Sequence, residues 1–196
     1  MKKNLMTLAA VLCCALAFTA CQKPENDADK GGDEKREESQ LDDPSAAIAK
    51  VVVEYKFHTT DDLLKFFDFN LEYIDVKSDS KLTEKVSTTE FKKEFSDASL
   101  PLNMGYKLTT TLKEGVTIDN LKAEGTMNYI RPFPTVWISM YDKDNKLIGD
   151  GGVRNTASVI PMSGKKVAEH FEAGSFDKSY YESVNEKGSG TTGTWK

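Results

Sequence analysis

The chain has 196 residues, of which 39% are hydrophobic and 29% charged, and its formal net charge is −5. No part of it is basic enough to indicate binding to DNA or RNA, so the composition excludes a nucleic-acid-binding protein. Beyond the N-terminal apolar run, no stretch approaches the roughly 20 apolar residues that a membrane-spanning helix requires.

The N-terminus has the features of a bacterial lipoprotein signal. Two lysines precede an apolar run at residues 5–18, which is short for a membrane span but typical of a signal-peptide core. The sequence "FTAC" resembles a lipobox, in which the cysteine is acylated and becomes the new N-terminus, although Phe18 replaces the usual leucine. We predict a signal peptide at residues 1–20 and lipidation of Cys21. The alternative is an ordinary secretory signal with a cysteine nearby.

Cysteine usage agrees with this interpretation. Cys13 and Cys14 lie in the predicted signal peptide and would be removed with it, which leaves Cys21 as the only thiol of the mature chain. Neither a disulfide nor a zinc site of cysteine ligands can then form within that chain, and we expect no metal or cofactor. Attachment to the membrane is the use that we assign to Cys21.

An acidic segment follows the predicted lipid anchor. Residues 22–44 contain nine acidic and four basic side chains, with only Ala28 and Leu41 as apolar ones. Such a segment cannot bury enough surface to offset its ordering entropy, so residues 21–44 are predicted to be a disordered tether. Its acidic residues resemble the export signal of outer-membrane lipoproteins in Bacteroides-type bacteria. The alternative is a spacer that carries no export signal. We expect an outer-membrane lipoprotein of the cell envelope, with surface-exposed and periplasmic orientations both open.

Residues 45–185 are predicted to form one β-rich domain, a normal size for a single core. Alternating apolar and polar residues predict strands at residues 50–58, 69–76, 103–115 and 153–161. A polar strand leads to Phe91 and Phe95, and two further strands are separated by Pro132 and Pro134. The second of these two strands is expected to end in a hairpin.

The clearest strand also predicts which side chains are buried. Its inward face is expected to consist of Met104, Tyr106, Leu108, Thr110 and Leu112, with Lys107 on the opposite face.

Three segments depart from the strand pattern. Residues 164–173 are predicted to form a short helix with Ser163 as its N-cap. Two interpretations stay open for residues 60–69, a helical turn or a bulged connection. Residues 186–196 are predicted to be a flexible tail unless Trp195 packs back onto the domain. The turn spacing favours a mainly β fold, an antiparallel sandwich or a barrel, with one short helix near the C-terminus.

Three stretches, in this order and spacing, resemble a group of small lipoproteins from gut Bacteroides-type bacteria. They are "HTTDDLLKFFDFNLEYID", "SLPLNMGYKLTTTLKEG" and "GKKVAEHFE", and the resemblance covers residues 48–183. It implies a cell-envelope location and an Ig-like β-sandwich. It implies no catalytic residue, because no activity is established for that group.

Catalytic and metal-binding motifs are incomplete in this chain. Ser163 and Lys166 have the S-x-x-K spacing of penicillin-recognising enzymes, but neither K-T-G nor S-D-N occurs, so we interpret Ser163 as a helix N-cap. Asp142 and Asp144 begin like a Ca²⁺ loop, but lysine and leucine follow where a ligand and the turn glycine belong. The chain has two histidines, too few for a histidine-rich metal centre. We predict a protein that is not an enzyme; a small hydrolase using Ser163 and Lys166 is the weakest alternative.

The segment "YIRPFPTVW" is the strongest candidate for a binding face. Arg131, Phe133 and Trp137 are of the residue types enriched at binding hot spots. The competing interpretation places the aromatic rings in the core and the prolines at an edge strand or bulge. We predict a non-catalytic binding or interaction domain that takes a carbohydrate or a protein as its ligand. The alternative is a structural subunit of a surface assembly that donates or accepts a β-strand.

Overall fold

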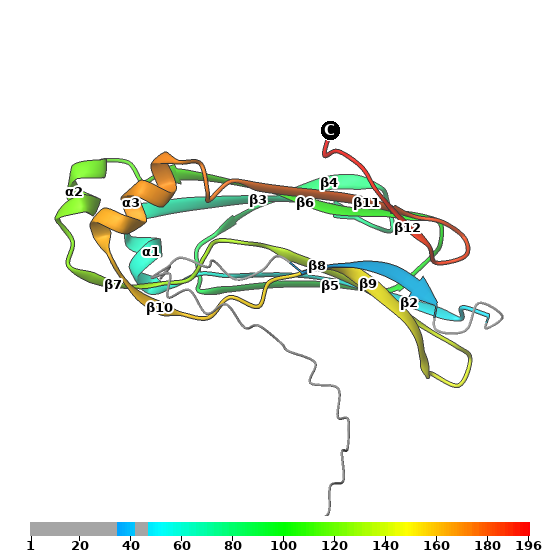
Figure 1. Ribbon diagram of the computed structural model, residues 1–196. Coiled ribbons are helices and arrows are strands. Elements are labelled where there is room, and N and C mark those ends of the chain that lie inside the picture. Colours follow the sequence, from blue (N-terminus) through cyan, green and yellow to red (C-terminus); the bar gives the residue numbers. More distant parts are fainter. Residues whose placement is uncertain (1–34, 42–46) are drawn as a thin grey trace, which may run out of the picture. The chain divides into compact units, whose positions relative to one another are not determined.

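Two antiparallel sheets packed face to face make up most of the described chain (Figure 1). The computed structural model describes residues 35–41 and 47–196. Each sheet has five strands, and a separate two-stranded ribbon accompanies them. The predicted mainly β, antiparallel sandwich is confirmed, and the barrel alternative is wrong because the strands form two separate sheets. The Ig-like arrangement stays a prediction.

The first sheet, sheet A, has the strand order β1-β9-β8-β2-β5. Its strands are β1 (Lys35–Leu41), β2 (Lys50–His58), β5 (Glu90–Ala98), β8 (Thr135–Tyr141) and β9 (Leu147–Arg154). The strand predicted at residues 50–58 coincides with β2, which pairs with β8 on one side and β5 on the other. Strict alternation along β2 buries one face, whose members are Val51, Val53, Tyr55 and Phe57.

The second sheet, sheet B, has the strand order β12-β11-β6-β3-β4. Its strands are β3 (Phe67–Asp75), β4 (Ser80–Val86), β6 (Leu102–Leu112), β11 (Lys178–Val184) and β12 (Gly190–Thr192). The face predicted for β6 is confirmed, since Met104, Tyr106, Leu108 and Thr110 are buried and Lys107 is exposed. Leu112, at the end of the strand, is half-buried and packs against the core.

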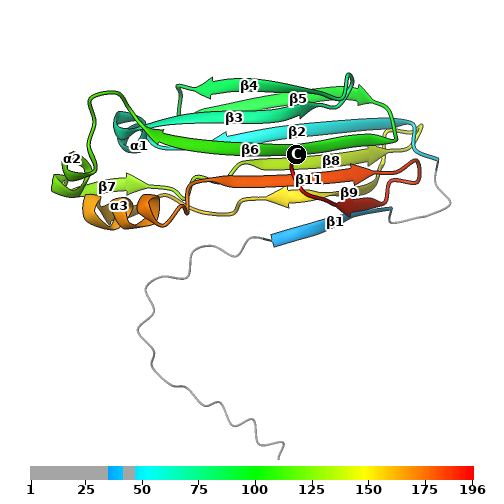
Figure 2. The same ribbon diagram turned by 90° about the horizontal axis from the view of Figure 1, so that it is seen from above.

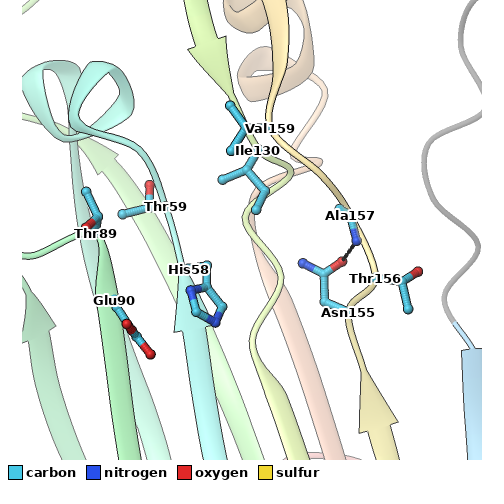
Figure 3. A pocket seen from close by; sticks show the side chains of 9 residues that line it. All are labelled: His58, Thr59, Thr89, Glu90, Ile130, Asn155, Thr156, Ala157 and Val159. Carbon is cyan, nitrogen blue, oxygen red and sulfur yellow. Dashed lines mark hydrogen bonds between the residues drawn. The ribbon is translucent and has the colours of Figure 1, made fainter.

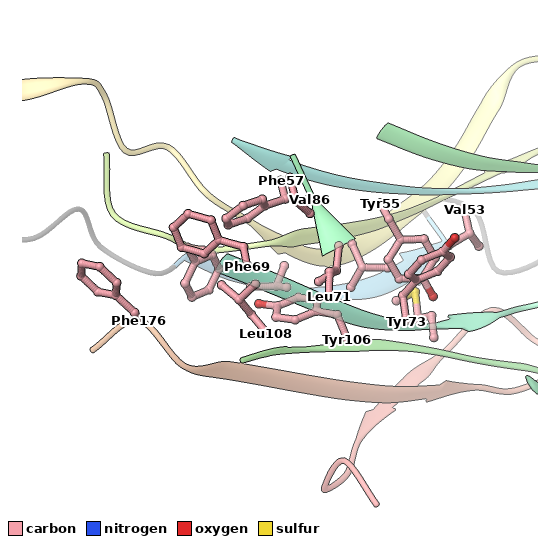
Figure 4. Close-up of a cluster of buried hydrophobic side chains, with 14 of the residues drawn as sticks. Val53, Tyr55, Phe57, Phe69, Leu71, Tyr73, Val86, Tyr106, Leu108 and Phe176 are labelled. Carbon is pink, nitrogen blue, oxygen red and sulfur yellow. The ribbon is translucent and has the colours of Figure 1, made fainter. Parts of the chain in front are cut away.

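Aromatic side chains from both sheets fill the space between them (Figure 4). The ring centroids of Tyr55 and Tyr73 lie 5.3 Å apart, and those of Phe57 and Phe69 are at the same separation. The hydroxyl of Tyr55 donates to the carbonyl of Ile74 at 3.0 Å. Burial raises the pKa of Tyr55, which keeps this hydroxyl protonated as a donor in the core.

Three short helices and the two-stranded ribbon lie together at one end of the sandwich (Figure 2). They are α1 (Asp61–Phe66), α2 (Ile118–Ala123), α3 (Gly164–Glu172), β7 (Thr126–Tyr129) and β10 (Ile160–Ser163). The hydroxyl of Thr60 accepts the N–H of Leu63 at 3.2 Å and donates to the carbonyl of Asn128 at 2.6 Å, so one side chain caps α1 and joins it to β7. None of the helices in the described part of the chain is long and apolar enough to cross a membrane.

The helix predictions were partly right. The helix predicted at residues 164–173 is confirmed as α3, and the helical turn is the correct interpretation within residues 60–69. One helix near the C-terminus was too few, because α1 and α2 are also present. The sequence did not predict α2, whose N-cap Thr117 forms a capping box with Asn120.

Strand β1 corrects the predicted limits of the tether. It pairs antiparallel with β9, with Lys35 opposite Arg154. The disorder predicted for residues 21–44 is therefore wrong for the seven residues of β1. Backbone hydrogen bonds can hold an edge strand even when its sequence is polar, and composition alone does not reveal this. The signal peptide and Cys21 lie outside the described residues and stay predictions.

The C-terminal segment is more ordered than predicted. Strand β11 was not predicted, and β12 pairs with it inside the segment 186–196 that we expected to be a flexible tail. The exception that we allowed for Trp195 applies. Nζ of Lys81 lies 5.1 Å from the centroid of the Trp195 ring, so the indole packs back onto the domain.

Candidate functional site

A depression of about 520 Å³ lies where β2 ends and β5 begins, at the helical end of sheet A (Figure 3). We call it the end depression. It is lined by His58, Thr59, Thr89, Glu90, Ile130, Asn155, Thr156, Ala157 and Val159. Because six of these residues are polar and three are apolar, the end depression offers both hydrogen-bonding groups and apolar surface to a ligand.

The paired ends of β2 and β5 form one wall of the end depression. His58 and Glu90 are directly opposite each other in the register, and both side chains are exposed because the alternation of β2 turns Phe57 into the core. One residue further on, the N–H of Thr59 donates to the carbonyl of Thr89 at 2.9 Å. This wall therefore presents an imidazole and a carboxylate on a rigid backbone.

The segment between β9 and β10 forms the opposite wall. Oδ1 of Asn155 accepts the N–H of Ala157 at 2.8 Å, and its Nδ2 donates to the carbonyl of Phe133 at 3.4 Å. A side chain that hydrogen-bonds to the backbone N–H two residues later in the sequence creates a local turn. The continuous strand predicted at residues 153–161 is therefore wrong, because this turn separates β9 from β10.

Thr59 places an unsatisfied polar atom beside the end depression. The residue is only 6% exposed, and its Oγ1 has no hydrogen-bond partner among the described residues. A buried hydroxyl without a partner costs about 1–3 kcal/mol.

Val159, which lines the end depression, is followed in the chain by a second exposed aliphatic residue, Ile160. Val159 and Ile160 are 55% and 46% exposed, and with Leu147 they are the exposed large hydrophobic residues of the described part of the chain. Leu147 lies at the other end of sheet A, where β9 begins. Isolated exposed apolar residues are ordinary, whereas adjoining ones beside a depression are typical of a binding surface.

The structure does not bring the three residues of the predicted binding face together. Phe133 lies in the core, where its ring meets the ring of Tyr106 edge to face at 6.3 Å. Arg131 is half-buried in the connection from β7 to β8. Trp137 lies on the outer face of sheet A. The two prolines of this connection interrupt the strand alternation, so residues two or four positions apart do not share a face here.

Trp137 has a structural environment of its own. Its strand neighbours Val136 and Ile138 belong to the core cluster and it does not, which places its ring on the opposite face of β8. The guanidinium carbon of Arg154 lies 3.3 Å from the ring centroid, and Trp137 is 7% exposed. Its Nε1 has no hydrogen-bond partner among the described residues. Arg154 thus covers a ring that we predicted to be available to a ligand.

The two motifs considered for catalysis and metal binding have local structural roles. The hydroxyl oxygen of Ser163 accepts the N–H of Lys166 at 3.3 Å as the N-cap of α3. Oδ1 of Asp142 accepts the N–H of Asp144 at 2.9 Å in the hairpin between β8 and β9, as predicted for that turn. Over residues 35–41 and 47–196, no three His, Cys, Asp or Glu side chains lie together as a metal site would require.

Sequence reasoning missed the end depression because its parts meet through tertiary pairing. His58 was recognisable as the polar end of a strand, but its pairing with Glu90 depends on the register between β2 and β5. Asn155 carried a weak local signal, since asparagine favours turns. Its position opposite His58 follows only from the strand order of sheet A.

Comparisons of the chain with protein-family models, with curated proteins and with solved structures find no match in any of the three. The chemistry of the described residues is therefore the basis for assigning a function.

Proposed function

We propose that this protein is a lipoprotein of the bacterial cell envelope, held to the outer membrane through Cys21, whose folded domain binds a protein partner without catalysis. The apolar N-terminal run and the lipobox-like "FTAC" support the anchor. Two acyl chains give stable attachment where one chain is marginal. The polar residues between Cys21 and β1 suit a domain that reaches away from the membrane.

The exposure of Val159, which lines the end depression, and of its chain neighbour Ile160 is the observation that carries the binding function. Protein interfaces combine an apolar centre with a polar rim, and Val159 with His58 and Asn155 in the end depression has this composition. A small ligand needs an enclosed pocket. Because Val159 leaves more than half of its surface in solvent, an extended polypeptide segment suits this site better.

Site-specific photo-crosslinking in intact cells tests the proposed interface. A photoreactive amino acid replaces Val159 or Ile160 in the full chain, and Leu147 serves as the matched position because it is 42% exposed at the other end of sheet A. We expect one recurrent protein adduct from the two positions at the end depression and none of that mass from Leu147. Identical adducts at all three positions would contradict the proposal.

A substitution within the end depression shows whether the crosslinked adduct depends on this site. Asn155→Ala removes the side chain that holds the second wall, so the adduct at Ile160 should weaken markedly. Lys143→Ala, in the distant hairpin between β8 and β9, should leave it unchanged. An adduct that persists at full yield in Asn155→Ala would argue against the end depression as the binding site.

The lipid anchor has its own test. Mass spectrometry of protein extracted from membranes should find a diacyl or triacyl modification on Cys21 as the N-terminal residue. The Cys21→Ala variant should move to the soluble fraction, because it lacks the acylated residue that we propose as the anchor. A Cys21→Ala protein that stays entirely with the membranes would refute the lipid anchor.

A second candidate function is that of a structural subunit, in an assembly whose copies are joined by strand addition. The pairing of strand β1 favours this function. β1 pairs with β9 at the edge of sheet A, and its sequence KREESQL has a single apolar residue. The pairing therefore depends on the backbone, which an equivalent strand of a second copy could supply equally well. Oligomers whose mass grows with concentration, and which disappear when residues 35–41 are deleted, would favour assembly over the binding function.

A further inference from the structure

A second depression, of about 520 Å³, lies beside Trp195 on the outer face of sheet B. We call it the Trp195 groove. The side chains that matter for a ligand are Glu72, Lys81, Lys107, Thr109, Ser179 and Trp195. The groove shares no lining residue with the end depression, so its ligand is independent of the function proposed above.

Contacts on two sides hold the C-terminal segment over sheet B (Figures 1 and 2). The N–H of Gly193 donates to the carbonyl of Tyr181 at 2.9 Å, and a Cβ at this glycine would lie 2.8 Å from the Tyr181 ring. Across the sheet, Nζ of Lys81 donates to the carbonyl of Lys196 and lies 5.1 Å from the centroid of the Trp195 ring. The indole is fixed by these contacts, and part of it remains exposed.

The sheet beneath this segment positions the polar groups of the groove. Lys107 faces outward because Leu108 faces the core, and Glu72 is its register partner on β3. Ser179 is opposite Lys107 on the other neighbouring strand, β11. Glu72, Lys107 and Ser179 therefore form a row across three strands, and Thr109 stands next to this row on β6.

The groove is lined by charges of both signs, since Glu72 and Asp177 are acidic and Lys81, Lys107, Lys178 and Lys196 are basic. Nζ of Lys107 lies 3.8 Å from a carboxylate oxygen of Glu72, and Lys81 bonds the Lys196 carbonyl. An anionic ligand would meet the carboxylate of Glu72, and a cationic one would meet the lysines. Like-charge contacts of this kind are costly, so the groove favours a ligand without net charge.

A pyranose sugar ring matches this set of groups. Its C–H bonds form an apolar face of partial positive charge, which packs on the negative face of an aromatic ring. Its hydroxyl groups both donate and accept hydrogen bonds, as do the hydroxyls of Thr109 and Ser179. The Glu72–Lys107 pair offers an acceptor and a donor side by side. We propose that the Trp195 groove binds a neutral pyranose residue of a glycan, stacked on Trp195 and hydrogen-bonded to the Glu72–Lys107 pair.

Fluorescence of the full chain in detergent provides the first test. The chain has two tryptophans, so the Trp137→Phe variant leaves Trp195 as the sole indole reporter. The probes are maltohexaose, cellohexaose, xylohexaose and mannohexaose, with hexagalacturonate as the acidic counterpart. We expect a saturable change in Trp195 emission with at least one neutral oligosaccharide. No response to any of the four would overturn the proposal, and so would a response to hexagalacturonate alone.

Substitutions then locate the site by calorimetric titration with the responding oligosaccharide. Trp195→Ala should weaken its affinity at least about tenfold, since ring stacking is lost. Lys107→Ala should weaken it several-fold, and Val159→Ala, at the end depression, should leave it unchanged. Unchanged affinity in Trp195→Ala with an unaltered thermal melt would refute the groove. Equal losses in Val159→Ala and Trp195→Ala would also refute it, because the sugar would then not be specific to sheet B.

Discussion

The two tryptophans of the chain lie on the outer faces of different sheets and have opposite surroundings. Trp137 belongs to a central strand of sheet A, is 7% exposed and lies against the guanidinium of Arg154. Trp195 lies outside the strands, over sheet B, where it contacts Lys81 and keeps part of its ring in solvent. The Trp137 ring is therefore packed within the sheet surface, whereas the Trp195 ring lies over a sheet and stays partly exposed.

This difference shows that an aromatic residue on an outer face can still be structural. Arg154 lies over the Trp137 ring, and Glu54, the register partner of Trp137 on β2, forms ion pairs with Lys56 and Lys92. Around Trp195 the polar groups line a groove and leave the ring accessible. Accessibility, and not residue type, separates the ring that we assign to the fold from the ring that we assign to a ligand.

The largest expected effect is the loss of the buried ring. Trp137→Ala should lower the free energy of unfolding by about 3–5 kcal/mol, the usual cost of truncating a buried aromatic residue. Trp195→Ala should cost only about 0.5–1 kcal/mol, the range of an exposed cation–π contact. Urea denaturation of the full chain measures both values. Trp137→Phe is the control and should cost less than Trp137→Ala, because the indole N–H has no partner to lose among the described residues. Equal costs for the two alanine variants would remove the distinction between the two regions.

The strand beneath the Trp195 groove allows a similar contrast between its two faces. Leu108→Ala should lower the free energy of unfolding by about 2–5 kcal/mol, because the side chain is buried among the rings of the core. Lys107→Ala, one residue away in the groove, should stay within about 0.5 kcal/mol. The same urea titrations compare the variants. A large loss at Lys107 would mean that the groove is part of the fold and not a surface available to a ligand.

Two glycines beside the tryptophans should also respond differently. Gly152, the register partner of Trp137, has φ +118°, and a Cβ there would lie 2.3 Å from the carbonyl oxygen of Val136. Gly152→Ala should therefore cost on the order of 3 kcal/mol through backbone strain and steric overlap. Gly193→Ala meets only the edge of the Tyr181 ring and should cost about 1 kcal/mol. Thermal melts followed by circular dichroism would reveal the difference; equal shifts of the midpoint would contradict it.

The smallest expected effect concerns the acidic residue beside Trp137. Burial alone would raise the pKa of Glu54, but hydrogen bonds from Lys56 and Lys92 outweigh it and hold the pKa below its usual value. A depressed carboxylate pKa stabilises the fold above the pKa of the unfolded chain, and the gain is lost as the pH falls through the folded pKa. Wild type and Glu54→Gln should therefore differ in urea midpoint at neutral pH and converge in acid. A constant difference across that range would show that this ion pair contributes nothing through its charge.

Local patterns in the sequence determined much of the strand content. Alternation alone located β2 and the buried face of β6, because one face of each strand meets the core and the other meets water. Capping chemistry located α3, and the proline pair marked the break between β7 and β8. These features depend on neighbours within a few residues, so one sequence contains the necessary information.

Tertiary pairing decided the rest, including both candidate sites. Strand β1 is polar and forms because β9 offers an unpaired edge, and the tail is held because Lys81 lies across the sheet from it. The contact of Arg154 with Trp137 depends on the register between β8 and β9. Such contacts join residues far apart in the chain, and a shift of one residue in a strand would reverse the faces that they occupy. The sequence by itself therefore determined a β-rich domain and predicted a lipoprotein signal before it, whereas the tertiary structure decided which tryptophan is covered and which is accessible.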